Sequence, residues 1–471
     1  MTEPLWTWGD LLAASGAVAD GSPTAAITGF SLDTRSLQPG EVFVAIRDVR
    51  DGHDFVLEAF RKGAAAALVE TGYKRVAGDG ALLRIGRPLE GLRNIARAAR
   101  ARSEAGVVAI TGSVGKTGTK EALRACLSRL GETHAAEKSF NNQWGVPLTL
   151  ARMPASARYG VFEIGMNHAG EIAPLSALVR PHVAIITTVE PVHLQFFASV
   201  ADIAEAKAEI FAGLEPGGTA VLNRDNAYFD LLQKRAREAG ARVFSFGRHA
   251  DADVRPEVWT LGAEGSDIAV RVGGKRIAYR LAAPGAHIAQ NSLAVVAALA
   301  TLGADVEAAL PALAGITAAK GRGARRELSL EDGAILLIDE SYNANPASMR
   351  SALAAMATVP RQRFKRRIAV LGDMLELGDQ SARLHEDLKE PVDAAEVDLV
   401  FACGPHMQRL YAALPSARRG EWGPTSQDIL APLVAAVRGG DVVMIKGSLG
   451  SRMEPLVEAL VRKSEVGAVG R

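Results

Sequence analysis

Short apolar runs alternate with longer amphipathic stretches in the middle of the chain. The runs at 107–110, 161–164, 183–188 and 219–222 have strand length, and a helical pattern at 116–130 follows the first of them. Apolar runs of this kind between helices are typical of strands buried on both faces of a parallel sheet. The pattern therefore predicts a doubly wound parallel sheet in this part of the chain.

The same alternation marks a smaller unit before this stretch. Residues 41–46 alternate like a strand, and residues 55–62 followed by Gly63 have the pattern of a helix with a glycine stop. A helix rich in Arg and Ala at 92–103 then leads into the strand at 107–110. We therefore expect a small α/β unit at the N-terminus.

A third unit follows the Gly-rich and basic stretch 320–326, which we interpret as a hinge. Strand-like runs return there, and each of them ends on a polar residue or glycine. Ligands of open α/β sheets bind beyond the carboxyl ends of strands, so Asp339, Asp373 and Lys446 are expected at a binding edge. The runs lie at 334–338, 368–371, 399–402 and 442–445.

Chain length agrees with three domains. The chain has 471 residues, and a prior of roughly 150 residues per domain gives about three. We place a small α/β domain at 1–104, a central doubly wound parallel-sheet domain at 105–324, and a Rossmann-like α/β domain at 325–471.

Composition narrows the classes of function. Lys plus Arg (54) nearly cancel Asp plus Glu (53), so no overall field favours nucleic acid or an anionic membrane. Cys126 and Cys403 lack C-x-x-C spacing and are expected to be buried thiols in a reducing compartment. Residues 1–20 do not have the pattern of an export signal, and no run of about 18 apolar residues exists. We expect a cytoplasmic protein without membrane insertion.

The clearest chemical motif lies between the strand at 107–110 and the helix at 116–130. There Gly112, Ser113, Val114 and Gly115 precede a Lys-Thr pair, which is the context of a phosphate-binding loop. Backbone N–H groups of such a loop surround phosphate oxygens. Lys116 would bridge the β and γ phosphates of ATP, and the Thr117 hydroxyl would ligate Mg²⁺.

This loop is a short variant, because Ile110 stands where the standard spacing has a glycine. A glycine turn that merely caps a helix is the alternative interpretation. Glu163 ends an apolar strand and needs a counter-charge if ionised, so it is a second candidate ligand of Mg²⁺. By spacing alone, Lys207 is a solvated surface lysine and His193 a structural histidine.

Three further segments stand in order beside this loop: SFNNQWGVP at 139–147, EIGMN at 163–167 and DESYNANP at 339–346. Together they resemble the Mur ligases over the whole chain. The resemblance implies a three-domain, ATP- and Mg²⁺-dependent ligase that activates a carboxylate as an acyl phosphate. Within the family, the chain resembles the ligase that joins D-alanyl-D-alanine to UDP-N-acetylmuramoyl-tripeptide, so we expect these small-molecule substrates and a monomer.

The resemblance also implies roles for individual residues. The N-terminal domain would hold the UDP part of the substrate, and the C-terminal domain the adenine and the incoming dipeptide. Lys207 would be carbamylated and would support a second Mg²⁺. The implied catalytic residues are Lys116, Glu163, His193 and Lys207; the metal ligands are Thr117, Glu163, His193 and carbamylated Lys207; ATP contacts are Gly112 to Gly118, Asn291, Arg322 and Asn345; substrate contacts are Ser31, Asp33, Thr34, Arg35, Asn141, Asn142, Asp373 and Lys446.

Some positions depart from the family pattern, namely Val114, Gly118 and Glu340. Gly118 removes one side-chain phosphate contact and costs up to about 1 kcal/mol of helix stability relative to Ala. The rival interpretations are the sibling ligase that adds the third amino acid, the ligase that extends folate with glutamate, and a nucleotide-binding switch. The first typically carries Asp-Asn-Pro-Arg, a tetrapeptide that this sequence lacks. The third peptide residue stays open between diaminopimelate and lysine.

Overall fold

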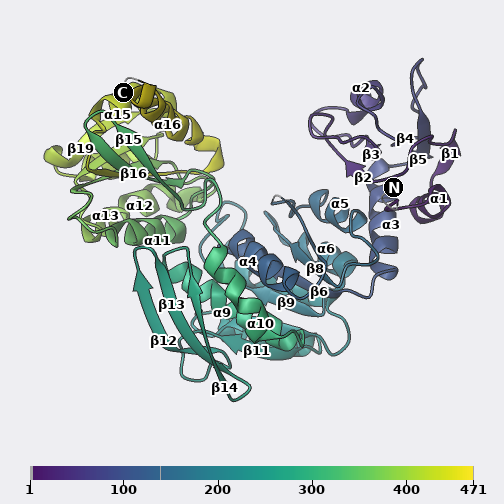
Figure 1. Ribbon diagram of the computed structural model, residues 1–471, viewed down its shortest axis with the longest axis horizontal. Coiled ribbons are helices and arrows are strands. Elements are labelled where there is room, and N and C mark those ends of the chain that lie inside the picture. Colours follow the sequence, from purple (N-terminus) through teal and green to yellow (C-terminus); the bar gives the residue numbers. More distant parts are fainter. Residues whose placement is uncertain (1–3, 138, 470–471) are drawn as a thin grey trace.

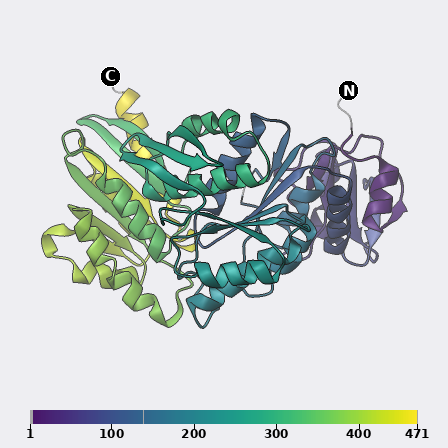
Figure 2. The same ribbon diagram turned by 90° about the horizontal axis from the view of Figure 1, so that it is seen from below.

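A computed structural model describes residues 4–137 and 139–469. It has an N-terminal part ending with α3, a central part from β6 to α10, and a C-terminal part from β15 to α16. Figures 1 and 2 show that the N-terminal and C-terminal parts lie on opposite sides of the central part. A ligand held by both outer parts must therefore extend across the central one.

The central sheet has six strands, all parallel, in the order β11-β10-β9-β6-β8-β7. Alternate residues of β6 (Gly106–Thr111) enter different cores: Val107 and Ala109 pack with α6 and α7, whereas Val108 and Ile110 pack with α4 and α9. Both faces of the sheet are therefore covered, which confirms the predicted doubly wound sheet. The other elements are α4 (Lys116–Ser128), β7 (Thr133–Ala135), α5 (Gly145–Ala151), β8 (Tyr159–Glu163), α6 (Ile172–Val179), β9 (Val183–Ile186), α7 (Val200–Ala208), β10 (Thr219–Asn223), α8 (Phe229–Glu238), β11 (Arg242–Phe246), α9 (Ala286–Thr301) and α10 (Val306–Ala309).

A separate antiparallel sheet of three strands interrupts this pattern, and the sequence analysis did not predict it. It consists of β12 (Arg255–Gly262), β13 (Gly265–Val272) and β14 (Lys275–Leu281). Gly273 and Gly274 have φ of 55° and 83°, as a tight two-residue hairpin turn requires. Alternate residues of β14 are buried and join the core of α4 and α9. The sheet therefore extends that core beyond the parallel strands.

The N-terminal part is a five-stranded sheet in the order β1-β5-β4-β3-β2, with only β1 antiparallel to its neighbour. The predicted helix at 55–62 is present, and Gly63, with φ of 92°, follows it closely. The elements are α1 (Trp8–Ser15), β1 (Val18–Asp20), β2 (Gly29–Ser31), β3 (Glu41–Val44), α2 (Val56–Arg61), β4 (Ala66–Glu70), β5 (Ala81–Ile85) and α3 (Pro88–Ala101).

The C-terminal part contains a six-stranded sheet in the order β15-β16-β20-β17-β18-β19, in which β15 is antiparallel. The four strands predicted here are β16, β17, β18 and β20; the edge strands β15 and β19 were not predicted. The elements are β15 (Ala324–Leu330), β16 (Gly333–Glu340), α11 (Pro346–Ala357), β17 (Arg366–Gly372), α12 (Ser381–Glu386), α13 (Lys389–Ala394), β18 (Leu399–Cys403), α14 (Met407–Ala413), β19 (Arg419–Gly423), α15 (Ser426–Ala436), β20 (Asp441–Lys446) and α16 (Glu454–Val469).

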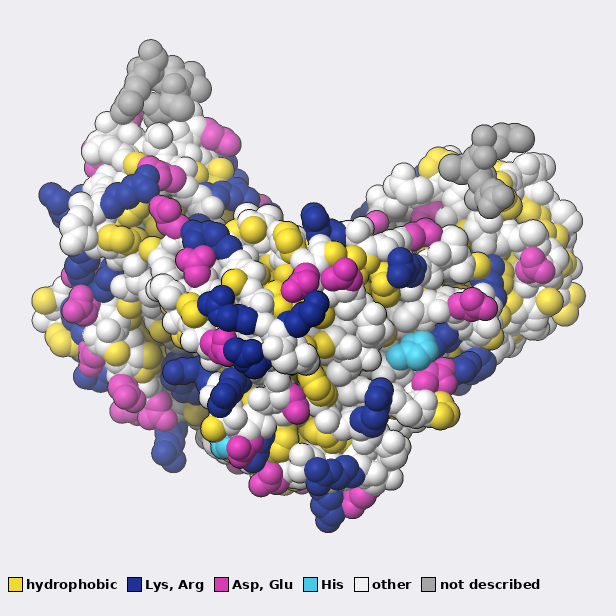
Figure 3. Space-filling view, turned by 60° about the horizontal axis from the view of Figure 1, so that its bottom comes forward, with side chains coloured by type: hydrophobic (Ala, Val, Ile, Leu, Met, Phe, Trp, Pro, Cys, Tyr) yellow, Lys and Arg dark blue, Asp and Glu magenta, His cyan; other side chains and the backbone are white. Residues whose placement is uncertain are grey.

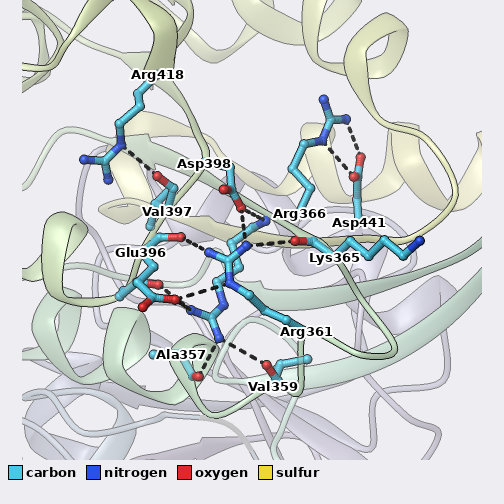
Figure 4. A network of polar contacts seen from close by, with 12 residues as sticks. Ala357, Val359, Arg361, Lys365, Arg366, Glu396, Val397, Asp398, Arg418 and Asp441 are labelled. Carbon is cyan, nitrogen blue, oxygen red and sulfur yellow. Dashed lines mark hydrogen bonds and ion pairs between the residues drawn. The ribbon is translucent and has the colours of Figure 1, made fainter.

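A polar network joins the amino ends of these strands (Figure 4). Arg366 binds the carboxylate of Asp441 with two hydrogen bonds of 2.8 and 2.7 Å, and Arg361 donates to Asp398 at 3.0 Å. Arg367 donates to the carbonyl oxygen of Ala357 at 2.8 Å, which satisfies the end of α11. This network lies at the edge opposite the carboxyl ends of the strands, so it holds the sheet together away from the predicted binding edge.

The surface agrees with the balanced composition. Lys and Arg side chains are interspersed with Asp and Glu over the face in Figure 3, and the formal net charge is +1. Figure 3 also shows a hollow between the two outer parts of the molecule. Across residues 4–137 and 139–469, every helix falls short of the length and apolar character that crossing a membrane requires.

Candidate active site

A cavity of about 1480 Å³ lies where the central part meets the C-terminal part, and α3 and α6 also contribute to its wall. Pockets for single small ligands usually measure about 300–1,000 Å³, so this one has room for a nucleotide and a second substrate. Most residues predicted from the sequence line it: Ser113, Val114, Gly115, Lys116, Thr117, Gly118, Asn141, Asn142, Glu163, His193, Asn291, Arg322, Asn345 and Lys446.

The phosphate loop connects β6 to α4 and depends on glycine at two positions. Gly112 and Gly115 have φ of 146° and 88°, which residues with a Cβ rarely adopt. A Cβ on Gly112 would lie 1.9 Å from Thr187 Oγ1, and one on Gly115 would lie 2.4 Å from Asn291 Nδ2. The backbone of this loop therefore passes close to Asn291, a predicted nucleotide contact on α9.

Lys116, the first residue of α4, folds back over the loop. Its Nζ donates to the carbonyl oxygen of Gly112 at 2.6 Å. Burial lowers the pKa of this ammonium, and Arg322 nearby lowers it further, while Glu163 opposes both effects. An anion at this position would offset the cost of holding two cations close together.

Glu163 and Thr117 place oxygen atoms side by side at the carboxyl edge of the central sheet. Glu163 ends β8 opposite Ile110 of β6, and its buried Oε2 accepts a hydrogen bond of 2.8 Å from the Thr117 hydroxyl. Its Oε1 accepts from Asn141 Nδ2 at 2.7 Å. In the part of the chain that the structure describes, no Lys or Arg is within ion-pair distance of Glu163.

These two oxygen donors fit Mg²⁺. Mg²⁺ is typically bound by one or two protein oxygens, with phosphate oxygens and waters completing six ligands. Among the described residues, no group of three His, Cys, Asp or Glu side chains could hold a metal by itself. A metal at this position must therefore take most of its ligands from substrate and water.

Ser139 is a site residue that the sequence analysis did not assign. Its Oγ lies 3.1 Å from Thr117 Oγ1 and accepts a hydrogen bond of 3.1 Å from Arg322 Nη2. It therefore connects the hydroxyl of the phosphate loop to the segment that leads into the C-terminal part. Ser139 could have been found from the sequence, because it is the hydroxyl residue at the start of the segment 139–147.

His193 lines the cavity and contacts the C-terminal part. Its Nδ1 is 2.5 Å from Glu376 Oε2, and the hydrogen bond from His193 lowers the pKa of Glu376. Gln195 N also donates to the carbonyl oxygen of Glu376 at 3.1 Å. Glu376 was not predicted from the sequence, because its partner is distant along the chain. The contact leaves Nε2 as the ring nitrogen available for another partner.

Lys207 is buried on α7, so the expectation from spacing that it is a solvated surface lysine was wrong. The helix packs its Lys-bearing face against the central core instead of exposing it. In the described part of the chain the Lys207 ammonium has neither a hydrogen-bond nor an ion-pair partner. Burial and the nearby Lys116 hold the pKa of Lys207 well below its usual value. Burial therefore favours the neutral amine, which is the nucleophilic form of this side chain.

Asn345 and Lys446 reach the cavity from the C-terminal part but are already engaged. The Asn345 side chain caps α11 by accepting from Ser348 N at 2.9 Å. Lys446 Nζ donates to Glu340 Oε2 at 3.1 Å and to the carbonyl oxygen of Asn343 at 3.0 Å. Glu340 and Lys446 are paired in register on β16 and β20, so their ion pair follows from the strand alignment.

The predicted uridine contacts lie in the N-terminal part and not at this cavity. Ser31 ends β2, and its hydroxyl donates to the carbonyl oxygen of Asp33 at 3.1 Å. The Asp33 carboxylate binds the Nε edge of Arg35, which lowers the pKa of Asp33 to about 2. One edge of the Arg35 guanidinium is therefore occupied by Asp33. Thr34 is buried beside them.

The structure does not bring Asp373 to the cavity. Its buried carboxylate accepts hydrogen bonds from the backbone N–H groups of Met407 at 2.7 Å and His406 at 3.3 Å. These groups begin α14, where backbone donors need a partner. Asp373 does follow a strand, as predicted, but its carboxylate faces a helix terminus and not the cavity.

Replacing Asp373 with Ala is expected to lower the free energy of unfolding by about 1–3 kcal/mol, because it leaves buried N–H groups without an acceptor. Urea denaturation checks this, and Asp379→Ala, another acidic residue after the same strand, is the matched control. A rise in the KM of an acceptor substrate with unchanged stability would instead support the substrate contact predicted from the sequence.

Comparison with known families agrees with this architecture. The Mur ligase middle domain matches residues 110–299, and the Mur ligase glutamate ligase domain matches residues 321–449. The UDP-N-acetylmuramoyl-tripeptide–D-alanyl-D-alanine ligase of Escherichia coli is 34% identical over 432 residues, covering 91% of this chain and 92% of that protein.

Solved structures match the whole chain as well. MurF from Acinetobacter baumannii superimposes with a TM-score of 0.84 at 29% identity, covering 97% of this chain and 99% of that one. MurF from Thermotoga maritima in complex with ADP has a TM-score of 0.77 at 27% identity, covering 93% of this chain and 98% of that one. With its phosphate loop, its buried Glu163 and these matches along nearly its full length, the chain belongs to the Mur ligase family.

Proposed function

We propose that this protein joins D-alanyl-D-alanine to UDP-N-acetylmuramoyl-tripeptide with consumption of ATP, forming the pentapeptide precursor of peptidoglycan. The observation that carries the proposal is one cavity that contains a phosphate loop, an adjacent Thr117–Glu163 pair and walls from two further parts of the chain. The relative from Escherichia coli, which matches over 91% of this chain, supports the choice of substrates.

The first step is attack of the tripeptide's terminal carboxylate on the γ-phosphorus of ATP. A bond forms from the carboxylate oxygen to phosphorus while the bond to the bridging oxygen breaks, giving an acyl phosphate and ADP. Lys116 exchanges the Gly112 carbonyl for phosphate oxygens and stabilises their developing charge. When bound, Mg²⁺ would be held by Thr117 Oγ1 and Glu163 and would neutralise phosphate charge.

The second step is attack of the dipeptide amine on the acyl carbon. The new carbon–nitrogen bond gives a tetrahedral intermediate, which expels inorganic phosphate and leaves the amide after loss of a proton. No nucleophilic side chain is needed. The enclosing walls of the cavity keep water from hydrolysing the acyl phosphate before the amine arrives.

We further propose a role for each part of the chain. Residues 1–104 bind the UDP moiety through Ser31, Asp33, Thr34 and Arg35; residues 105–324 bind ATP; residues 325–471 bind adenine and the dipeptide. For Arg35 this requires that its ion pair with Asp33 open or that the second guanidinium edge be used. We propose a cytoplasmic location, because the substrates are soluble nucleotides, and a monomer, because one chain holds all the proposed contacts.

We also propose that Lys207 is carbamylated. Carbamylation requires an uncharged amine to attack carbon dioxide, and the burial of Lys207 favours that form. The product is an anion, which together with His193 could bind a second Mg²⁺ beside the γ-phosphate. A carbamate would also place a negative charge near the Lys116 ammonium.

Phosphate release measured with purified protein tests the main proposal. Turnover is expected only when ATP, Mg²⁺, UDP-N-acetylmuramoyl-tripeptide and D-alanyl-D-alanine are all present. The diaminopimelate and lysine forms of the tripeptide are compared side by side. Turnover with UDP-N-acetylmuramoyl-dipeptide and a single amino acid would identify the sibling ligase. Turnover with folate and glutamate would identify the folate ligase. A rate of phosphate release that is the same with and without every acceptor would identify a nucleotide-binding switch.

A further inference from the structure

Arg322 lies in the segment that connects the central and C-terminal parts, and its backbone is held firmly. Residues 316–323 have no regular secondary structure. Gly321 N donates to Asp339 Oδ2 at 2.9 Å, and Gly323 N donates to the carbonyl oxygen of Asp339 at 2.8 Å. Both neighbours of Arg322 are therefore anchored to the end of β16, and only its long side chain is left to be oriented.

The ring of Tyr342 provides that orientation. The guanidinium carbon of Arg322 lies 3.9 Å from the centroid of the Tyr342 ring, which is the geometry of a cation–π contact. Tyr342 N donates to the carbonyl oxygen of Gly321 at 3.0 Å. A Cβ on Gly321 would lie 2.9 Å from Tyr342 Cβ, so only glycine lets the two segments approach this closely.

The guanidinium points from the Tyr342 ring toward the phosphate loop. Its Nη2 donates to Ser139 Oγ, which lies 3.1 Å from Thr117 Oγ1. Arg322 also lowers the pKa of Lys116, so the two cations are close in space. Within the described residues, Arg322 forms no ion pair with a carboxylate. Its charge is held in place by an aromatic face that does not neutralise it.

We propose that Tyr342 is a positioning residue that holds Arg322 against the phosphate loop and leaves its charge free for the phosphates of ATP. A carboxylate partner would fix the same side chain but would cancel much of its attraction for an anion. The aromatic face fixes it and keeps the charge. This inference rests on the proposed use of ATP, because it concerns how the cation that meets the triphosphate is oriented.

A double-mutant cycle tests the inference, with ATP affinity from calorimetry and kcat and KM from phosphate release. Tyr342→Leu is expected to reduce kcat/KM for ATP roughly 2- to 30-fold, the range from exposed to desolvated cation–π contacts. Tyr342→Phe, which keeps the ring face, is expected to retain most of the activity. In an Arg322→Ala background, Tyr342→Leu is expected to have almost no further effect.

Three results would overturn the inference. An equal effect of Tyr342→Leu in both backgrounds would mean that the ring contacts the nucleotide directly. A loss with Tyr342→Phe as large as with Tyr342→Leu would assign the effect to the hydroxyl. An Arg322→Ala variant with normal ATP affinity and turnover would show that Arg322 does not act on ATP, so that its orientation by Tyr342 has no effect.

Failure of the inference can be told apart from failure of the proposed function. The wild-type protein tests the function through phosphate release that requires D-alanyl-D-alanine, whatever the variants do. Circular dichroism melting curves show whether each variant folds. If the Leu variant does not fold, Tyr342→Met, which is apolar and flexible, replaces it in the same cycle with the same expected results.

Discussion

Replacing Lys116 with Met is expected to lower kcat for the ligation about 10²- to 10³-fold, the usual effect of removing one preorganised donor from a reacting oxyanion. Met keeps the apolar stem that packs in the buried site but removes the charge. The side chain of Lys116 is half-buried, and the partner of its ammonium in the structure is the carbonyl oxygen of Gly112. Its electrostatic effect on phosphate is therefore only weakly screened by water.

Steady-state phosphate release with all substrates measures this effect. Lys234→Met is the matched control, because Lys234 lies on α8 with a side chain that is 71% exposed. Melting curves of both variants confirm folding. A Lys116→Met enzyme whose kcat stays within about fivefold of wild type would contradict the role of Lys116 in stabilising the transferred phosphate.

Replacing Lys207 with Ala is expected to have the second large effect, a loss of about 10²-fold or more in kcat, on the scale of losing a preorganised charged group at the reacting phosphate. Because the carbamate is a carboxylate carried by the lysine, acetate or propionate is expected to restore part of the activity. Removing carbon dioxide from the buffer is expected to lower the activity of the wild-type protein. A ¹³C signal from labelled bicarbonate, present in wild type and absent in the variant, detects the carbamate directly.

The pH dependence of unfolding gives an independent test at Lys207. The unfolded chain carries this lysine protonated at neutral pH, whereas burial favours the neutral amine in the folded state. The unfolded state therefore binds more protons, so this group destabilises the fold at neutral pH and does so less as pH rises toward the ordinary lysine pKa. In carbonate-free buffer, where Lys207 is not carbamylated, Lys207→Met is expected to raise the free energy of unfolding at pH 7 and to weaken its dependence on pH.

The expected loss of activity and the expected gain of stability together distinguish a catalytic role of Lys207 from a structural one. A merely structural lysine would lose stability and activity together when replaced. Lys207 is expected to lose activity while stability stays equal or rises. A Lys207→Ala variant with wild-type turnover in carbonate-free buffer would rule out the carbamate.

Much of the fold was visible in local patterns. The run at 107–110 is apolar on every residue and the run at 161–164 on every residue but Glu163, because these strands are covered on both faces, so the local pattern indicated a parallel sheet. The local pattern did not predict the sheet of β12 to β14. Its exposed outer residues make the strands look like polar loops, and burial by α4 and α9 is visible only in the folded structure.

The candidate site also has a part that could be predicted from the sequence and a part that could not. Gly112 to Thr117 are contiguous, so the loop and its chemistry could be predicted from sequence. Ser139, Glu376 and Tyr342 act through partners far away in the chain, and no local pattern indicates such pairs. Asp373 was predicted as a substrate contact from its place at a strand end, but its carboxylate binds the N-terminus of α14. The strand-end position alone does not distinguish these two partners.

The sequence by itself determined the phosphate loop, the family resemblance and the parallel sheet, because each depends on residues that are neighbours along the chain or on their periodicity. Only the tertiary structure decided which of these groups meet. It buried Lys207 near Lys116, turned Asp373 away from the cavity and placed Arg322 between Tyr342 and Ser139. The physical reason is that burial and ion pairing depend on the environment that distant segments create around a side chain.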